Sequence, residues 1–131
     1  MEYILGIFSG SGDSRSSGSV ELKKFNSDFK QLLIDGEMID AGFAVQRDTL
    51  LFTSKRLILV DIQGISGRQL EYLSIPYHKI TKFSVQTGSQ FDLNAELKIW
   101  VGSDAIPIEK KFNKDLNIYE VQKVLASHLL K

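Results

Sequence analysis

Residues Leu50 to Ile80 read LLFTSKRLILVDIQGISGRQLEYLSIPYHKI, and this stretch decides the fold. Its apolar runs are separated by short polar or glycine-containing breaks, a pattern that indicates consecutive antiparallel strands. The run RLILVDI at 56–62 is apolar almost throughout, which is typical of a strand buried in a sheet. We therefore predict strands at 49–53, 56–62 and 69–75. Pro76 ends the last of them, because it has no backbone N–H to donate to a neighbouring strand.

The same pattern continues on both sides of this stretch. The segment 94–101 alternates most regularly, with apolar residues on one face and Glu96, Lys98 and Trp100 on the other. Pro107 suggests that part of the final strand lies at a sheet edge. Four further strands are predicted, at 38–46, 80–86, 94–101 and 105–112.

Two amphipathic helices flank the strands. The first begins at Ser19, which can cap it, and continues until Asp35 and Gly36 end it. The second is capped by Asn117 and is long enough to lie across one open end of a small barrel. The spacing therefore predicts a mainly β (β+α) fold: a seven-stranded sandwich or partly open barrel closed by a C-terminal helix, with an additional N-terminal helix. The apolar stripes of the two helices are Leu22, Phe25, Phe29, Leu32 and Leu33, and Ile118, Val121, Leu125 and Leu129.

The first 19 residues differ in composition from the rest. Residues 3–8, YILGIF, form a short apolar arm, and residues 9–19, SGSGDSRSSGS, have the composition of a flexible linker. Gly10 and Gly12 do not make a phosphate-binding loop, because no Gly-Lys-Ser/Thr follows them. We predict an arm and linker at 1–19 and one folded domain at 20–131.

The bulk composition excludes several classes of function. Lys plus Arg and Asp plus Glu number 16 each, and this balance argues against a sequence-independent nucleic-acid binder. The absence of Cys excludes disulfides, Cys-ligated zinc and thiol catalysis. The apolar arm is too short for a signal peptide, and no segment reaches the length of a membrane span. We expect a cytoplasmic protein with no cofactor, no metal and no nucleic-acid partner.

Several ordered blocks of the sequence resemble the bacterial pleckstrin-homology-like domains, and the resemblance covers nearly the whole chain. It implies two nearly orthogonal antiparallel sheets of seven strands, with a C-terminal helix closing one corner. It also implies assembly into homo-oligomers, including rings, but no settled biochemical activity. The blocks are LIDGE at 33–37, FTSKRLILVD at 52–61, YLSIPY at 72–77, FDLNAELKIW at 91–100 and IYEVQK at 118–123.

The candidates for catalysis are few. The two histidines, His78 and His128, are not paired with a nucleophile in any recognisable motif, and we interpret both as solvated. The acidic residues form no paired motif for metal or glycoside chemistry. We therefore expect a protein that is not an enzyme and has no catalytic residues.

Lys55, Arg56 and Arg68 are the candidates for the alternative function, a membrane-surface module that binds anionic lipid headgroups. The resemblance weighs against it. Eukaryotic pleckstrin-homology domains that hold phosphoinositides use a long basic loop between the first two strands, and here that loop is only Arg47 and Asp48. We interpret Lys55 and Arg56 as charges that keep a hairpin turn in water.

Self-association is the function that the sequence favours. Trp100 lies on the polar face of its strand, and a large indole on an outward face is typical of an interface. Phe91 and Tyr72 are further candidates for that interface. The other interpretation is that the N-terminal helix covers Trp100 within one subunit, and aromatic content alone does not separate the two.

The arm adds Ile4, Leu5, Ile7 and Phe8 to the candidate interface. These residues can dock on their own domain, on a neighbouring subunit or at a membrane surface. No Lys or Arg flanks them closely, so we expect exchange between subunits rather than membrane insertion. The sequence thus predicts a non-enzymatic binding or scaffold module that forms a homo-oligomer and can dock a protein partner at an edge strand.

Overall fold

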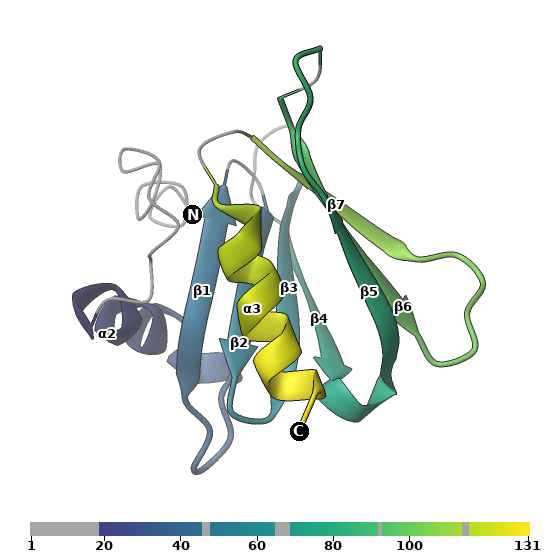
Figure 1. The fold of residues 1–131 in the computed structure, drawn as a ribbon. Helices are drawn as coiled ribbons and strands as arrows, with labels where there is room; N and C mark the ends of the chain where they lie inside the picture. The colour runs from purple at the N-terminus through teal and green to yellow at the C-terminus, as the bar shows by residue number, and fades with distance from the viewer. Residues whose placement is uncertain (1–18, 46–47, 65–68, 92, 114–115) are drawn as a thin grey trace.

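The computed structural model describes residues 19–45, 48–64, 69–91, 93–113 and 116–131. They form two antiparallel sheets, one of four strands in the order β1-β2-β3-β4 and one of three in the order β5-β6-β7 (Figure 1). The strands are β1 (Ile39–Val45), β2 (Asp48–Thr53), β3 (Arg56–Gln63), β4 (Gln69–Pro76), β5 (Ile80–Gln86), β6 (Ala95–Val101) and β7 (Ile108–Phe112). The predicted fold class is confirmed.

The main core lies between the two sheets. Every second residue of β2 and β3 points into it, because successive side chains of a strand point to opposite faces. The three-stranded sheet contributes the apolar face of β6 that the alternation predicts. The strand residues of this core include Leu50, Phe52, Leu57, Leu59, Leu97, Ile99 and Phe112, all almost fully buried.

Helix α3 (Ile118–Leu129) lies over the opening between the two sheets (Figure 1). Asn117 caps it as predicted, because its side-chain oxygen accepts a hydrogen bond from the backbone N–H of Tyr119 at 3.0 Å. The predicted apolar stripe is also confirmed. Ile118, Val121 and Leu125 are buried in the main core, and Leu129 packs against it.

Helix α2 (Ser19–Asp28) covers the opposite face of the four-stranded sheet. Phe25 and Phe29 pack there on the residues of β2 and β3 that alternate with those of the main core, including Leu51, Ile58 and Val60. Phe25 lies directly over Gly42 of β1, where no side chain separates the ring from the strand. The sheet is therefore covered on both faces, which explains why the run at 56–62 is almost continuously apolar.

The N-terminal helix is shorter than predicted. It ends at Asp28 instead of running to Asp35, and a 3₁₀ turn, η1 (Lys30–Leu32), follows it. Phe29 has left the helical conformation, with φ −112° and ψ 18°. The side chain of Asn26 hydrogen-bonds both the backbone N–H and the backbone C=O of Ile39, which fixes the end of the helix against the start of β1. Local spacing cannot reveal this long-range contact.

The remaining boundaries differ from the predictions by a few residues at most. Strand β7 begins at Ile108 instead of Ala105, because residues 102–107 form the loop after β6 and Pro107 cannot donate a backbone hydrogen bond. A second 3₁₀ turn, η2 (Tyr77–Lys79), connects β4 to β5 and so leads the chain from one sheet to the other. The predicted turn at 47–48 lies partly outside the described residues.

Candidate interaction surfaces

Strand β4 is an edge of the four-stranded sheet. Within the described residues it pairs only with β3, since the next strand in sequence, β5, begins the other sheet. Tyr72 lies opposite Val60 on the face that α2 covers, and Leu73 lies opposite Leu59 on the core face. Both side chains are nevertheless about two-fifths exposed, at 40% and 42%. One strand thus presents a free backbone edge with an apolar side chain exposed on each of its two faces.

Trp100 lies on the outer face of the three-stranded sheet, as its parity predicts. Helix α2 packs on the other sheet, so it does not cover the indole. The ammonium group of Lys82, directly opposite on β5, lies 4.7 Å from the centre of the Trp100 ring, which is half-buried. Such a cation–π contact is favourable at a solvent-exposed site.

The rest of that outer face is charged. Lys98 lies 3.7 Å from Glu96 on the same strand and opposite Glu109 on β7, and Lys111 lies opposite Glu96. Opposite charges that face each other across strands stabilise a solvated sheet. Trp100 therefore stands at one end of a mixed-charge surface rather than in an apolar patch.

Phe91 lies in the connection between β5 and β6 and is 91% exposed. Its backbone N–H donates a hydrogen bond to the Ser89 hydroxyl at 3.2 Å. Tyr72, Trp100 and Phe91 thus lie on three different elements: an edge strand, a central strand of the other sheet, and a hairpin connection. The remaining interface candidates, Ile4, Leu5, Ile7 and Phe8, lie outside the described residues.

Arg56 is held by groups within its own domain. Its Nε and Nη2 donate to the two carboxylate oxygens of Glu37 at 2.9 and 3.0 Å. Nη2 also donates to the backbone C=O of Leu32 at 2.6 Å, and Nη1 donates to the Ser74 hydroxyl at 2.9 Å. The guanidinium group therefore links η1, the segment before β1, and β4. These contacts engage four of its five N–H groups, so a phosphate group could form a two-point contact with it only by displacing one of these acceptors.

Glu37 is the buried partner in this network. Thr53 donates its hydroxyl to Oε2 at 2.6 Å, and the backbone N–H of Ile34 donates to Oε1 at 3.1 Å. Burial by itself raises the pKa of a carboxyl, but the hydrogen bonds from Arg56, Thr53 and Ile34 outweigh it and lower the pKa of Glu37 to about 2. Of the other two anion-binding candidates, Lys55 is exposed in the β2–β3 turn and Arg68 lies outside the described residues.

The two histidines differ in environment. His78 is exposed, as predicted. The expectation that His128 is solvated is wrong, because only 14% of its side chain is exposed and its ring stacks on Tyr77 with centroids 4.2 Å apart. Its Nε2 lies 3.4 Å from Oδ1 of Asp40 on β1. Tyr77 in turn donates its hydroxyl to the backbone C=O of Thr53 at 2.7 Å, so the stack holds the end of α3 against the four-stranded sheet.

A charged cluster connects the two sheets. Lys110 of β7 lies on the core face, and its Nζ is 2.7 Å from Oδ1 of Asp61 on β3 and 3.6 Å from Oδ1 of Asp48 on β2. Burial, together with a hydrogen bond between the two carboxyls, raises the pKa of Asp48 to about 6 in spite of Lys110. The pKa of Asp61 is lowered, because hydrogen bonds from Asp48 and Lys110 outweigh its burial.

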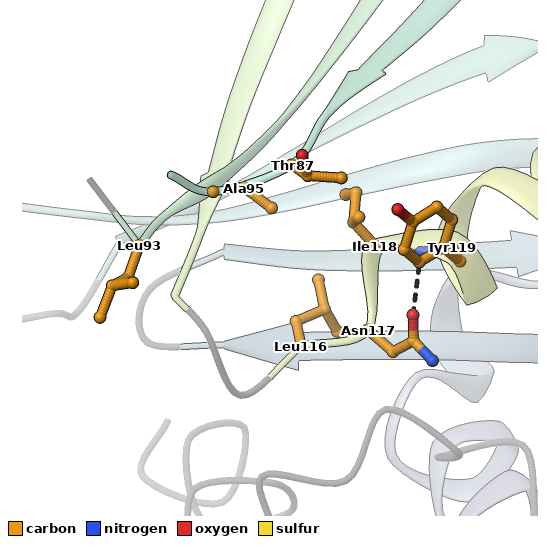
Figure 2. A pocket seen from close by; sticks show the side chains of 8 residues that line it. Thr87, Leu93, Ala95, Leu116, Asn117, Ile118 and Tyr119 are labelled. Carbon is orange, nitrogen blue, oxygen red and sulfur yellow. Dashed lines mark hydrogen bonds between the residues drawn. The ribbon is translucent and has the colours of Figure 1, made fainter. Parts of the chain in front are cut away.

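A hollow of about 480 Å³ lies where the β5–β6 connection approaches the start of α3 (Figure 2). Its floor is buried and continuous with the main core, whereas Leu93 and Tyr119 at its sides are exposed. The figure shows Leu93 on the side opposite Ile118 and Tyr119. The lining residues are Thr87, Gly88, Leu93, Ala95, Leu116, Asn117, Ile118 and Tyr119, none of them charged.

Neither metal ligands nor a membrane-spanning helix occur in the part of the chain that the structure describes. No three His, Asp or Glu side chains converge there as a metal site. No helix there is both long and apolar enough to cross a bilayer.

The fold defines the class of protein. Seven strands in two antiparallel sheets, with a C-terminal helix over their open side, are the architecture of a pleckstrin-homology domain. The sequence model of the bacterial PH domain matches residues 9–129, and the chain belongs to that family. The resemblance predicted from the sequence is thus confirmed.

Individual relatives agree with this assignment. The uncharacterized protein YjqA of Bacillus subtilis is 44% identical over 97% of this chain and 98% of its own length. The crystal structure of the pleckstrin homology domain from Shewanella amazonensis superposes with a TM-score of 0.74 at 37% identity, covering 84% of this chain and 99% of that one. The pleckstrin-homology-domain protein of Shewanella loihica gives 0.73 at 36% identity, over 82% and 92%.

Proposed function

We propose that this bacterial PH domain is a non-enzymatic binding module that assembles with copies of itself through the outer edge of β4. The observation that carries the proposal is the exposure of Tyr72 and Leu73 on opposite faces of an edge strand. Alternate backbone N–H and C=O groups of an edge strand point away from its sheet and can pair with a strand of another copy. The two side chains would then be buried by the added strand and its neighbours.

The other edges of the sheets are less suited to this role. Strand β1 contacts α2 and strand β5 contacts α3, so each has a helix packed against it. Strand β7 spans only Ile108 to Phe112. Strand β4 runs from Gln69 to Pro76 and offers a longer ladder. Proteins usually protect such an edge with charged side chains or a covering segment. On β4, by contrast, the side chains of Tyr72 and Leu73 are apolar and exposed.

The competing functions find less support in the described residues. Lipid-headgroup binding loses Arg56 as a free donor, because its hydrogen bonds hold η1, Glu37 and β4 together. An anion clamp normally uses several convergent donors, and bidentate arginines are the strongest of these. Catalysis by His128 is disfavoured by its stacking on Tyr77, which fixes the ring inside the fold.

The experiment compares charged substitutions on separate surfaces. Tyr72→Lys combined with Leu73→Lys places two positive charges on the β4 edge, and sedimentation velocity at micromolar concentration should show a shift to monomer. The matched control is Ile106→Lys, an 80% exposed apolar residue between β6 and β7, which should leave the assembly intact. Circular dichroism checks that every variant is folded.

The same series tests the other two aromatic candidates. If Trp100→Glu or Phe91→Lys dissociates the assembly while the β4 variant does not, the contact lies on the three-stranded sheet or on the hairpin connection. The β4 proposal would then be wrong. Because Trp100 is only half-buried and its partner is Lys82, its replacement should leave a folded domain in either case.

A further inference from the structure

The hollow beside α3 has the character of a binding site for a short apolar segment. Its floor consists of Ala95, Leu116 and Ile118, which are buried and belong to the main core, so a side chain that enters it would extend that core. Its volume of about 480 Å³ lies within the range of about 300–1,000 Å³ that is usual for ligand sites. No charged residue lines it, so an ionic ligand would find no counter-charge there.

Gly88 and Leu93, on one side of the hollow, lie close together in the connection between β5 and β6. A Cβ atom on Gly88 would lie 2.5 Å from the backbone oxygen of Leu93, so the two strands of the connection approach each other more closely than any other residue would allow. Leu93 stands beyond this close approach and is 55% exposed, and Tyr119 on the opposite side is 60% exposed. The apolar surface that a docked segment could cover therefore lies mainly on Leu93 and Tyr119, on either side of a floor that is already almost fully buried.

The chain itself contains a segment of matching chemistry. Residues 3–8, YILGIF, carry no charge and include four bulky aliphatic or aromatic residues after Tyr3, namely Ile4, Leu5, Ile7 and Phe8. An uncharged apolar segment loses no ionic hydration when it enters an uncharged hollow. Each large apolar side chain that it buries contributes roughly 1.5–3 kcal/mol.

The linker allows this contact within one chain. Between Phe8 and Ser19 the chain is SGSGDSRSSG, which reaches about 33–36 Å when fully extended. The folded part, residues 20–131, has an expected radius of gyration of about 13 Å, so the fully extended linker is about as long as the domain is wide. Where the linker spans the distance, docking is an intramolecular step, which raises the local concentration of the arm at the hollow.

We propose that residues 4–8 of the arm dock in the hollow of their own domain, between Leu93 and Tyr119. The contact goes beyond self-association and does not require it, because the β4 edge lies on the other sheet. Docking would bury apolar side chains of the arm against Leu93 and Tyr119.

The test uses the absence of cysteine from the chain. A variant of the full chain carrying both Ile7→Cys and Tyr119→Cys is oxidised with a mild oxidant, and disulfide formation is followed on non-reducing gels and by mass spectrometry. The matched control carries Ile7→Cys with Ile106→Cys, which places the second thiol at an exposed site on the β6–β7 loop. We expect an intrachain disulfide that forms at least about ten times faster in the first variant than in the control.

A third variant tests whether the apolar chemistry drives the contact. Adding Phe8→Asp to the Ile7–Tyr119 pair should slow the disulfide to the rate of the control, because a carboxylate is costly to bury in an uncharged hollow. Equal rates for the Ile7–Tyr119 and control pairs, or no effect of Phe8→Asp, would overturn the proposal.

Disulfides that join two chains instead of one would overturn it as well, since the arm would then belong to a neighbouring copy. Sedimentation of the same proteins under reducing conditions records the assembly state separately. If the chain sediments as a monomer but the intrachain disulfide forms quickly, only the β4 proposal is contradicted. If the chain assembles but the intrachain disulfide forms no faster than in the control, only the proposal for the arm is contradicted.

Discussion

Arg56 and Glu37, although 19 positions apart in the sequence, form a two-point ion pair that joins the segment before β1 to the first residue of β3. The Glu37 side chain is fully buried and each of its oxygens accepts two hydrogen bonds. Arg56 also holds η1 through Leu32 and β4 through Ser74. A buried carboxylate is tolerated when it keeps its ion-pair partner and its hydrogen bonds, whereas the loss of the arginine leaves an uncompensated buried charge.

Loss of Arg56 should therefore destabilise the domain strongly. We expect Arg56→Met to lower the free energy of unfolding by about 3–5 kcal/mol, measured by urea denaturation at neutral pH. Lys55→Met, at the neighbouring exposed position, should change it by less than about 0.5 kcal/mol. Similar effects of the two substitutions would show that Arg56 is a solvated turn residue, as the sequence alone suggests.

The pH dependence of stability should also report the network. The pKa of Glu37 is about 2 in the folded protein and 4.5 for the free side chain, so the unfolded chain binds a proton first as the pH falls. The stabilisation by Glu37 is present above pH 4.5 and is lost as the pH falls towards 2. It amounts to about 3 kcal/mol. The difference in unfolding free energy between wild type and Glu37→Gln should shrink over that window, and a constant difference would contradict the assignment.

The sequence predicts the strands well because their pattern is local. Alternation at Ala95, Leu97 and Ile99 requires only that one face of a strand be buried, and the structure buries those residues. A local pattern does not predict the ion pair between Arg56 and Glu37. The two residues are 19 positions apart, and they meet only because of the register of three strands.

Asp48 should change the pH dependence of stability in the opposite direction to Glu37. Its pKa is about 6 in the fold and 3.8 for the free side chain, so its contribution is most favourable below pH 3.8 and is lost as the pH rises through 6. Asp48→Asn should therefore gain stability relative to wild type between about pH 4 and 7. We expect about 1 kcal/mol, because a third of the side chain is exposed and solvent screens the full shift.

The matched control for Asp48 is its partner in the same cluster. Asp61→Asn removes the carboxylate 2.7 Å from Lys110, a lysine whose side chain is only 13% exposed. It should destabilise the domain at neutral pH, since Asp61 is the carboxylate closest to that ammonium group. If both substitutions shift the thermal midpoint in the same direction at pH 7, the two carboxyls do not play the different roles described above.

The lack of a side chain at Gly42 should contribute to the packing of α2 on β1. A Cβ atom there would lie 2.5 Å from Cε2 of Phe25, whose ring is fully buried. Gly42→Ala should therefore lower the free energy of unfolding by about 1–3 kcal/mol through overpacking. Thermal denaturation measures the effect, and Phe25→Leu in the Gly42→Ala background should restore part of it. If Gly42→Ala instead raised the free energy of unfolding, the close contact between Gly42 and Phe25 would not limit the packing of α2.

The candidate site was harder to predict than the fold. Parity placed Trp100 correctly on an outer face, but its cation–π contact with Lys82 depends on the pairing of β5 with β6. The exposure of Leu73 could not be predicted from the sequence, because its position in the strand places it on the core face. It is exposed there because β4 is an edge strand, since β5 belongs to the other sheet. The stacking of His128 on Tyr77 likewise joins residues that are far apart in the sequence.

Static light scattering across a concentration series tests self-association most directly. The chain has a mass of 14.7 kDa, and we expect the wild-type protein to scatter as a defined multiple of that mass at micromolar concentration. Lysines at positions 72 and 73 should return the scattering mass to that of one chain while the domain stays folded. A wild-type protein that scatters as a single chain throughout the series would contradict the account.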